Sequence, residues 1–145
     1  PLTVTITESL AIGHDNGTTD NLDLSQTYTH SFSGILNTSK RVIKLANTNL
    51  TEVATFGSDT ADGAFVRADV RYIRVTNLDG TDALQVGLDD EASDAAYTSV
   101  AANSSIMYTG TTCEGGNGGT TLDNATALKV KGVAGHQLEV FIASV

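Results

Sequence analysis

The sequence is poor in cysteine, proline and tryptophan. Its 145 residues include one Cys, one Pro at the first position and no Trp. A single cysteine excludes an intramolecular disulfide, so the fold does not depend on an oxidising compartment. Because no proline lies inside the chain, we expect Gly, Asn and Asp to separate its secondary-structure elements.

Charge is also scarce, and one sign dominates. Charged residues make up 17% of the chain, with 17 Asp and Glu against 8 Lys and Arg, and the net charge is −9. Proteins that bind nucleic acids or anionic membranes need basic patches to contact phosphate groups. No apolar run approaches the roughly 18 to 20 residues of a membrane-spanning helix. We therefore expect neither nucleic acid nor membrane as a partner.

The N-terminal segment "PLTVTITESL" lacks the basic region and the apolar core of a signal peptide. A start at Pro1 is what removal of an initiator Met before a small residue leaves. The sequence accordingly predicts a cytoplasmically made chain with its natural start.

Alternation of apolar and polar residues is the clearest pattern. In "LTVTITE", Leu2, Val4 and Ile6 alternate with threonines, and "LSQTYTHSFSG" alternates in the same way. A period of two predicts strands with one buried face. The other candidate strands are "KRVIKLA", "NLTEVATF", "GAFVRADVRYIRVTN", "DALQVGLDD", "AAYTSVAA", "SSIMYTG", "ALKVKG" and "HQLEVFIASV". About ten short strands without a helical stripe predict an all-β fold, an antiparallel, jelly-roll-like β-sandwich forming one domain over residues 1–145.

Two finer predictions concern how these strands pair. We expect "ALKVKG" and "HQLEVFIASV" to form a hairpin through residues 133–135. In the long strand over residues 63–77, the apolar face changes phase between Tyr72 and Ile73, which predicts a β-bulge there. With that bulge, Arg67, Arg71 and Arg74 line one outward stripe together with Asp69 and Thr76.

The arginine stripe has two interpretations. It is either a solvated strand face, worth roughly 0 to 1 kcal/mol per ion pair, or a subunit interface in which Arg binds carboxylates. The N-terminal strand, if its edge is open, can extend the sheet of a neighbouring subunit. The candidate partner-binding residues are therefore Arg67, Arg71, Arg74, Leu2, Val4 and Ile6.

No catalytic, cofactor-binding or metal-ligating motif is present, so we expect no enzymatic activity and no cofactor. Two alternatives stay open. One is a surface calcium site at Asp89, Asp90 or Glu91, although Asp-rich segments are commonly turns. Tyr97 or Tyr108 would be the aromatic platform of a glycan site, although Tyr in a strand is more often half-buried packing.

A family resemblance covers about residues 71–145. The runs "VRYIRVTNLDGTDALQVGLDD", "AAYTSVAANSSIMYTG" and "ALKVKGVAGHQLEVFIASV" resemble the small β-sandwich virion proteins of tailed bacteriophages, particularly those of cyanobacterial hosts. The shared pattern is strand and turn chemistry without a catalytic residue. The resemblance implies a non-enzymatic virion structural protein, foremost a capsid decoration (cement) protein on the outer shell.

The alternative role within that class is a neck, tail or fibre component, including a glycan-binding module for host recognition. The partners that the resemblance implies are the major capsid protein or other virion proteins. Together with the sequence pattern, it leads us to expect a homo-oligomer, a trimer, located in virions that assemble in the host cytoplasm.

Overall fold

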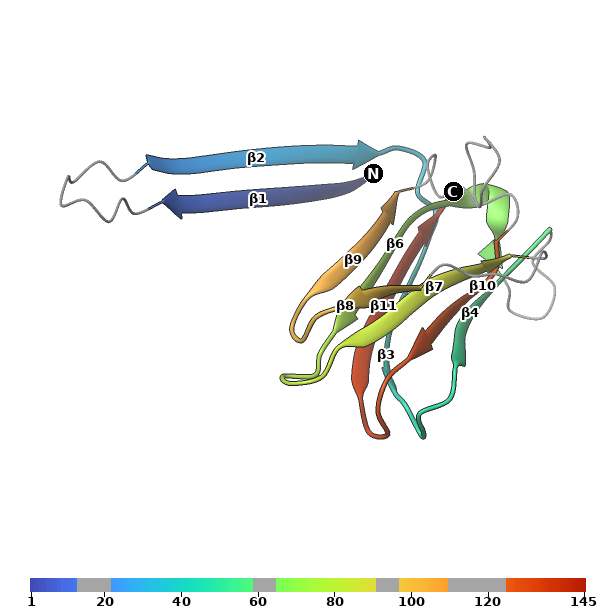
Figure 1. Ribbon diagram of the computed structural model, residues 1–145. Helices are drawn as coiled ribbons and strands as arrows, with labels where there is room; N and C mark the ends of the chain where they lie inside the picture. The colour runs from blue at the N-terminus through green and yellow to red at the C-terminus, as the bar shows by residue number, and fades with distance from the viewer. Residues whose placement is uncertain (13–21, 59–64, 91–96, 110–124) are drawn as a thin grey trace. The chain divides into compact units, whose positions relative to one another are not determined.

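The computed structural model describes residues 1–12, 22–58, 65–90, 97–109 and 125–145. Within these residues the chain forms eleven β-strands and one short 3-10 turn (Figure 1). The fold is all-β, as the sequence predicts. The chain divides into two compact units, Pro1–Gly34 and Ile35–Val145. Each unit is described by itself below, and a single domain over residues 1–145 stays a prediction.

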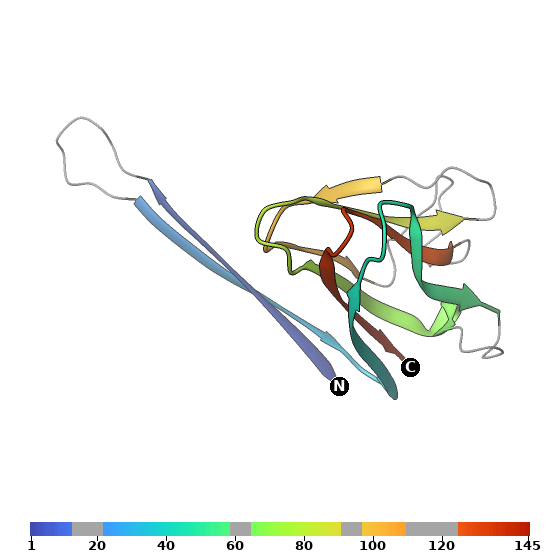
Figure 2. The same ribbon diagram turned by 90° about the horizontal axis from the view of Figure 1, so that it is seen from below.

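The N-terminal unit is a two-stranded antiparallel ribbon. Strand β1 (Leu2–Ile12) pairs with β2 (Leu22–Phe32) along its whole length. The register sets Leu2 opposite Phe32 and Ile6 opposite Tyr28, so these side chains share one face. The other face consists mostly of Thr and Ser, and the hydroxyls of Thr7 and Thr27 lie 3.4 Å apart. Both predicted strands are confirmed, and Figure 2 shows their mutual twist.

The second unit is a sandwich of two sheets. The β6 sheet has the strand order β3-β11-β6-β9, and the β7 sheet has the order β5-β4-β10-β7-β8. The strand bounds are β3 (Asn37–Lys44), β4 (Thr51–Gly57), β5 (Phe65–Val66), β6 (Val70–Asn77), β7 (Leu84–Asp90), β8 (Tyr97–Val100), β9 (Ser105–Thr109), β10 (Ala125–Lys131) and β11 (Gln137–Ser144).

The strand order of this unit is that of a jelly roll. Apart from the short β5, successive strands change sheets except for β7 and β8, which are neighbours in the β7 sheet. The first and last strands of the sandwich, β3 and β11, are neighbours, and the second and second-to-last, β4 and β10, also pair. Every described strand pair is antiparallel except β4 with β5. The predicted antiparallel, jelly-roll-like sandwich is therefore confirmed for this unit.

Apolar side chains from both sheets fill the space between them. Val75, Leu84, Leu128 and Leu138 are completely buried, and they belong to strands β6, β7, β10 and β11. Burying such a side chain contributes roughly 1.5 to 3 kcal/mol, so this layer accounts for much of the stability of the sandwich. The interior of this unit is a packed core.

The predicted C-terminal hairpin is wrong. Strand β10 pairs with β4 and β7, whereas β11 pairs with β3 and β6 in the other sheet. The connection crosses between the sheets, and Gly135 donates a backbone hydrogen bond of 2.8 Å to the carbonyl of Leu45. Two strands joined by a short connection need not pair with each other when each pairs with two other strands, here in two different sheets.

The predicted long strand over residues 63–77 is also corrected. Its first part, β5, joins the β7 sheet, its last part, β6, joins the β6 sheet, and the 3-10 turn η2 (Arg67–Asp69) connects them. A segment that changes sheets has to turn, which breaks the strand. The expected phase slip is present, because the pairing with β11 passes from Tyr72 to Val70 and leaves Arg71 out of register. The irregularity thus lies one residue before the predicted bulge.

Candidate functional site

Positive charge is concentrated in the β6 sheet. Its strands contain a single carboxylate, Glu139, and five basic residues, Lys40, Arg41, Lys44, Arg71 and Arg74. The strands of the β7 sheet hold Lys129 and Lys131 against Glu52, Asp89 and Asp90. The strands of the β6 sheet therefore carry a net positive charge, although the net charge of the chain is −9.

The outer face of the β6 sheet holds a connected cluster. Alternation along the strands directs Lys40, Arg74, Glu139 and Phe141 away from the core. The Glu139 carboxylate lies 3.1 Å from Lys40 Nζ and accepts a hydrogen bond of 2.7 Å from Arg74 Nη2. The Arg74 guanidinium lies 5.8 Å from the centre of the Phe141 ring. One carboxylate thus holds two cations beside an aromatic ring.

Titration of this cluster follows its contacts. The hydrogen bond from Lys40, with further help from Arg74, lowers the pKa of the Glu139 carboxyl despite partial burial. Burial raises the pKa of the Tyr72 hydroxyl, and the nearby Arg74 charge opposes that shift. The ring of Tyr72 packs on Phe141 with 5.9 Å between centres. Glu139 therefore stays ionised at neutral pH, and the face keeps a net positive charge.

Exposed apolar side chains flank the cluster. Val42 is 62% exposed on β3, and Met107 is 37% exposed on β9. The register places Met107 directly beside Arg74 and Val42 directly beside Glu139. Arg, Met and aromatic residues are enriched in protein–protein interfaces. We name this surface the cationic face, defined by Lys40, Val42, Arg74, Met107, Glu139 and Phe141.

The predicted arginine stripe is only partly present. Arg74 belongs to the cationic face, but Arg67 lies in the turn η2, between the two sheets' strands. Arg71 Nη1 donates to the carbonyls of Ala68 at 2.6 Å and Val70 at 3.3 Å, so it holds the turn locally. The predicted outward alignment of the three arginines is therefore wrong, because the chain changes sheets between them.

The other predicted site residues lie in the N-terminal ribbon. Leu2, Val4 and Ile6 share the apolar face of β1, as the alternation predicts. Ile6 is 38% exposed, and Tyr28 opposite it is 49% exposed. Sequence reasoning missed the role of β3, although "NTSKRVIK" places three basic residues without a carboxylate in one strand, which is an observable signal.

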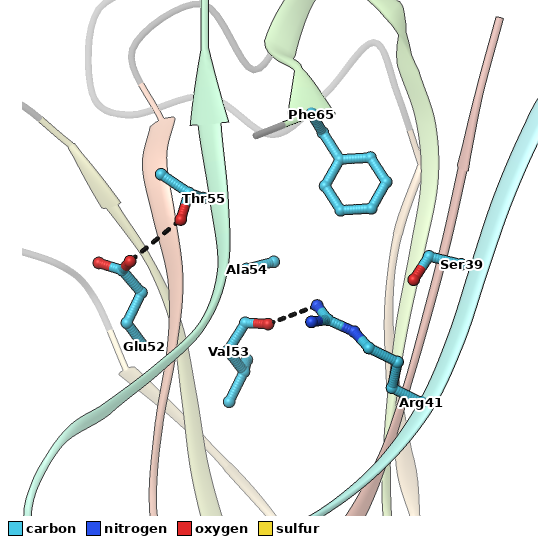
Figure 3. Close-up of a pocket in the computed structure, with 7 residues that line it drawn as sticks. All are labelled: Ser39, Arg41, Glu52, Val53, Ala54, Thr55 and Phe65. Atoms are coloured by element: carbon cyan, nitrogen blue, oxygen red, sulfur yellow. Dashed lines mark hydrogen bonds between the residues drawn. The ribbon is translucent and has the colours of Figure 1, made fainter. Parts of the chain in front are cut away.

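A hollow of about 320 Å³ lies where β3 and β4 face each other at the side of the sandwich (Figure 3). Arg41 reaches across from β3, and its Nη2 donates a hydrogen bond of 2.6 Å to the Val53 carbonyl. Ser39, Ala54 and Phe65 also line the hollow, as do Thr55 and Glu52, and Thr55 Oγ1 donates a hydrogen bond of 3.0 Å to the Glu52 carboxylate. The hollow is shallow and polar, and it offers a guanidinium to an anionic group.

The alternative sites have different outcomes. Asp89 forms an ion pair with Lys129, whereas Glu91 and the side chain of Asp90 lie outside what the structure describes. Among the described residues, no group of three or more His, Cys, Asp or Glu side chains is placed to hold a metal ion. Tyr97 is 38% exposed, while Tyr108 packs against the core.

None of the described segments forms a helix with the length and hydrophobicity needed to span a membrane. The chain matches no protein-family model, no curated protein and no solved structure.

Proposed function

We propose that the protein is a non-enzymatic structural component of a bacteriophage virion, a decoration protein that binds the outer surface of the capsid as a trimer. Its partners would be the major capsid protein and further copies of itself. The strand and turn pattern over residues 71–145 supports this role, because it resembles that of tailed-phage virion proteins. Jelly-roll sandwiches also recur in viral capsid proteins, although a fold alone does not define a function.

The observation that carries the proposal is the N-terminal ribbon. A two-stranded ribbon is marginally stable in water unless its apolar face packs against something else. Here one face presents Leu2, Val4, Ile6 and Tyr28, and the last two remain largely exposed. The ribbon is therefore stabilised when its apolar face packs on another protein, and this property suits an arm that attaches the protein to a shell.

The sandwich supports a structural role in a second way. Among the described residues, two polar side chains of the sandwich are fully buried, Asn77 and His136. Asn77 Oδ1 and His136 Nε2 are hydrogen-bonded at 2.6 Å, whereas His136 Nδ1 has no hydrogen-bond partner in that part of the chain. Asn77 holds turns in place through its hydrogen bonds, and neither side chain lines the hollow between β3 and β4. The acidic chain also suits the outer shell surface, which does not contact packaged DNA.

The test is a binding assay with capsid shells that lack the protein. Replacing Leu2, Val4 and Ile6 with Thr keeps β-propensity but removes the apolar face, and we expect binding to fall at least about tenfold. Deleting residues 1–7 should abolish binding. The matched control replaces Thr3, Thr5 and Thr7 on the opposite face with Ser and should bind normally. Normal attachment of the deletion variant, or absence of the protein from purified virions, would contradict the proposal.

A host-recognition module that binds glycans is the second candidate. The exposed ring of Tyr97 lies in one cross-strand row with Gly87, Lys129 and Glu52 of the β7 sheet. Because Gly87 has no side chain, the ring and the Lys129–Asp89 ion pair border one open surface. An aromatic ring beside polar groups suits a sugar, and jelly rolls include lectins. Glycan-array binding that disappears in Tyr97→Ala would favour this function over shell decoration.

A further inference from the structure

Strand β3 forms a regular free edge of the β6 sheet. It pairs with β11 over all eight residues without a register shift, and no described strand pairs with its other side. The bond from Leu45 N to His136 O sets the phase of the ladder. Alternate residues of an antiparallel strand direct their backbone groups to opposite sides, so those of Thr38, Lys40, Val42 and Lys44 face away from β11. This edge is a template for one more strand.

The charge of this edge is positive. Lys40, Arg41 and Lys44 lie on β3 and no carboxylate does. Lys40 pairs with Glu139, whereas neither Arg41 nor Lys44 forms an ion pair with a carboxylate among the described residues. Two cations therefore remain available to a ligand along the open edge.

Arg41 points into the hollow beside the edge. One of its five N–H donors is engaged by the Val53 carbonyl. Arg41 lines the hollow together with Ser39 and Phe65, and its guanidinium forms no other hydrogen bond within the described part of the chain (Figure 3). A guanidinium fork binds a carboxylate with two parallel hydrogen bonds. Glu52 also lines the hollow, but its carboxylate accepts a hydrogen bond from Thr55 Oγ1 and points away from Arg41 (Figure 3). The part of the hollow next to Arg41 therefore suits the side chain of an Asp or Glu that enters from the edge.

Lysines on an edge strand commonly protect a sheet from unwanted pairing. Protected edges are typically short, bulged or interrupted by proline, and β3 has none of these features. Its cations repel basic segments but attract acidic ones. The exposed Val42 adds an apolar contact on the same strand.

We infer that the β3 edge binds an extended acidic segment of a partner protein, which pairs with β3 as an additional strand and places a carboxylate against Arg41. Backbone hydrogen bonds supply affinity that does not depend on sequence, and the two available cations, Arg41 and Lys44, select for Asp and Glu.

The probe is a blocked peptide of alternating Val and Glu, as long as β3, with binding to the full chain followed by calorimetry. We expect binding that weakens as salt is raised, because salt screens the exposed charges. The same peptide with Lys in place of Glu should not bind. A Val-Glu peptide with N-methyl groups at alternate residues cannot form the ladder, and it should also lose binding. Amide hydrogen exchange at Lys40 and Val42 should slow in the complex.

Variants distinguish binding at the β3 edge from a general effect of the charge of the chain. Lys44→Glu should weaken peptide binding about tenfold, the loss expected for one charge-assisted contact. Lys131→Glu makes the same charge change at an exposed position in the β7 sheet, and it should leave binding within about twofold. Arg41→Lys keeps the charge without the fork and should also weaken binding. Its melting temperature would report any loss of the bond to Val53.

Three results would overturn the inference. Equal binding of the N-methylated peptide would exclude strand addition. Equal effects of Lys44→Glu and Lys131→Glu would exclude a site at β3. Absence of peptide binding, combined with self-association of the wild type that Lys44→Glu abolishes, would assign the edge to a second copy of the chain instead.

Discussion

Asn77 is a buried side chain whose hydrogen bonds join separate turns of the sandwich. Its Nδ2 donates to the carbonyls of Asp82, Val100 and Ala101 at 2.8, 3.1 and 3.1 Å. Since Nδ2 is the donor in these bonds, Oδ1 is the acceptor, and His136 Nε2 must carry the proton that it donates. One amide thus fixes the end of β6, the start of β7 and the end of β8.

Asn77→Ala should lower the free energy of unfolding by about 2 to 4 kcal/mol, because several buried polar groups lose their partners together. Urea denaturation measures this loss. The control is Asn49→Ala, at an exposed position, which should change stability by less than about 0.5 kcal/mol. Similar small losses in both variants would show that water or a shift of the chain replaces the Asn77 bonds.

Asp79 makes the free energy of unfolding depend on pH in the acidic range. Its Oδ1 accepts hydrogen bonds from the backbone of Asp82 and from the backbone and hydroxyl of Thr81, and these lower the carboxyl pKa from 3.8 to about 2. A lowered acid pKa stabilises the fold above the unfolded value of 3.8, and this contribution is lost as pH falls towards about 2. The stability difference between the wild type and Asp79→Asn should therefore shrink over that interval. Urea denaturation at several pH values measures it, and a constant difference would contradict this role.

At the scale of elements, the crossing from β10 to β11 depends on a close approach at Gly132. A Cβ there would lie 2.8 Å from His136 Nδ1 and 3.1 Å from Leu45 Cδ1, both in buried side chains. Gly132→Ala should therefore destabilise the sandwich by about 1 to 3 kcal/mol, which thermal unfolding would report. Gly80→Ala is the matched control, since its Cβ would meet nothing nearer than 3.9 Å. Equal melting temperatures for the two variants would mean that His136 moves freely.

The period of two predicts which segments are strands but not which strands pair. It identifies β10 and β11 from "ALKVKG" and "HQLEVFIASV", yet both have the same pattern whether they form a hairpin or lie in opposite sheets. The same limit applies to β5 and β6, because alternation continues across the turn η2 where the chain changes sheets. The partner of a strand is decided by long-range packing, which local pattern does not contain.

For the candidate site, too, the sequence predicts individual residues but not which of them lie together. Arg74 stands out from the sequence as an outward cation, and its position on the cationic face confirms that part of the prediction. Its neighbours Lys40 and Phe141 come from strands far away in the sequence, and only the register of β11 with β3 and β6 brings them together. The composition shows that basic residues are few, but only the strand topology shows that most of them lie in the β6 sheet.

For the whole molecule, charge opposes association and the ribbon favours it. Each chain carries −9, and residues 1–34 contain no Lys or Arg, so copies that meet through their ribbons repel one another at low salt. The contact itself would be made by apolar side chains such as Ile6 and Tyr28, which salt does not screen. Assembly through the ribbon and assembly through ion pairs should therefore respond to salt in opposite directions.

We expect self-association of the wild type, measured by sedimentation equilibrium, to strengthen as salt is raised from about 0.05 to 0.5 M, because the Debye length falls well below about 10 Å. The variant with Leu2, Val4 and Ile6 replaced by Thr should stay monomeric throughout. The opposite result would be association that weakens as salt is raised and that the variant retains. It would mean that the cationic face, and not the ribbon, joins the subunits, because ion pairs with acidic surfaces lose strength when salt screens them.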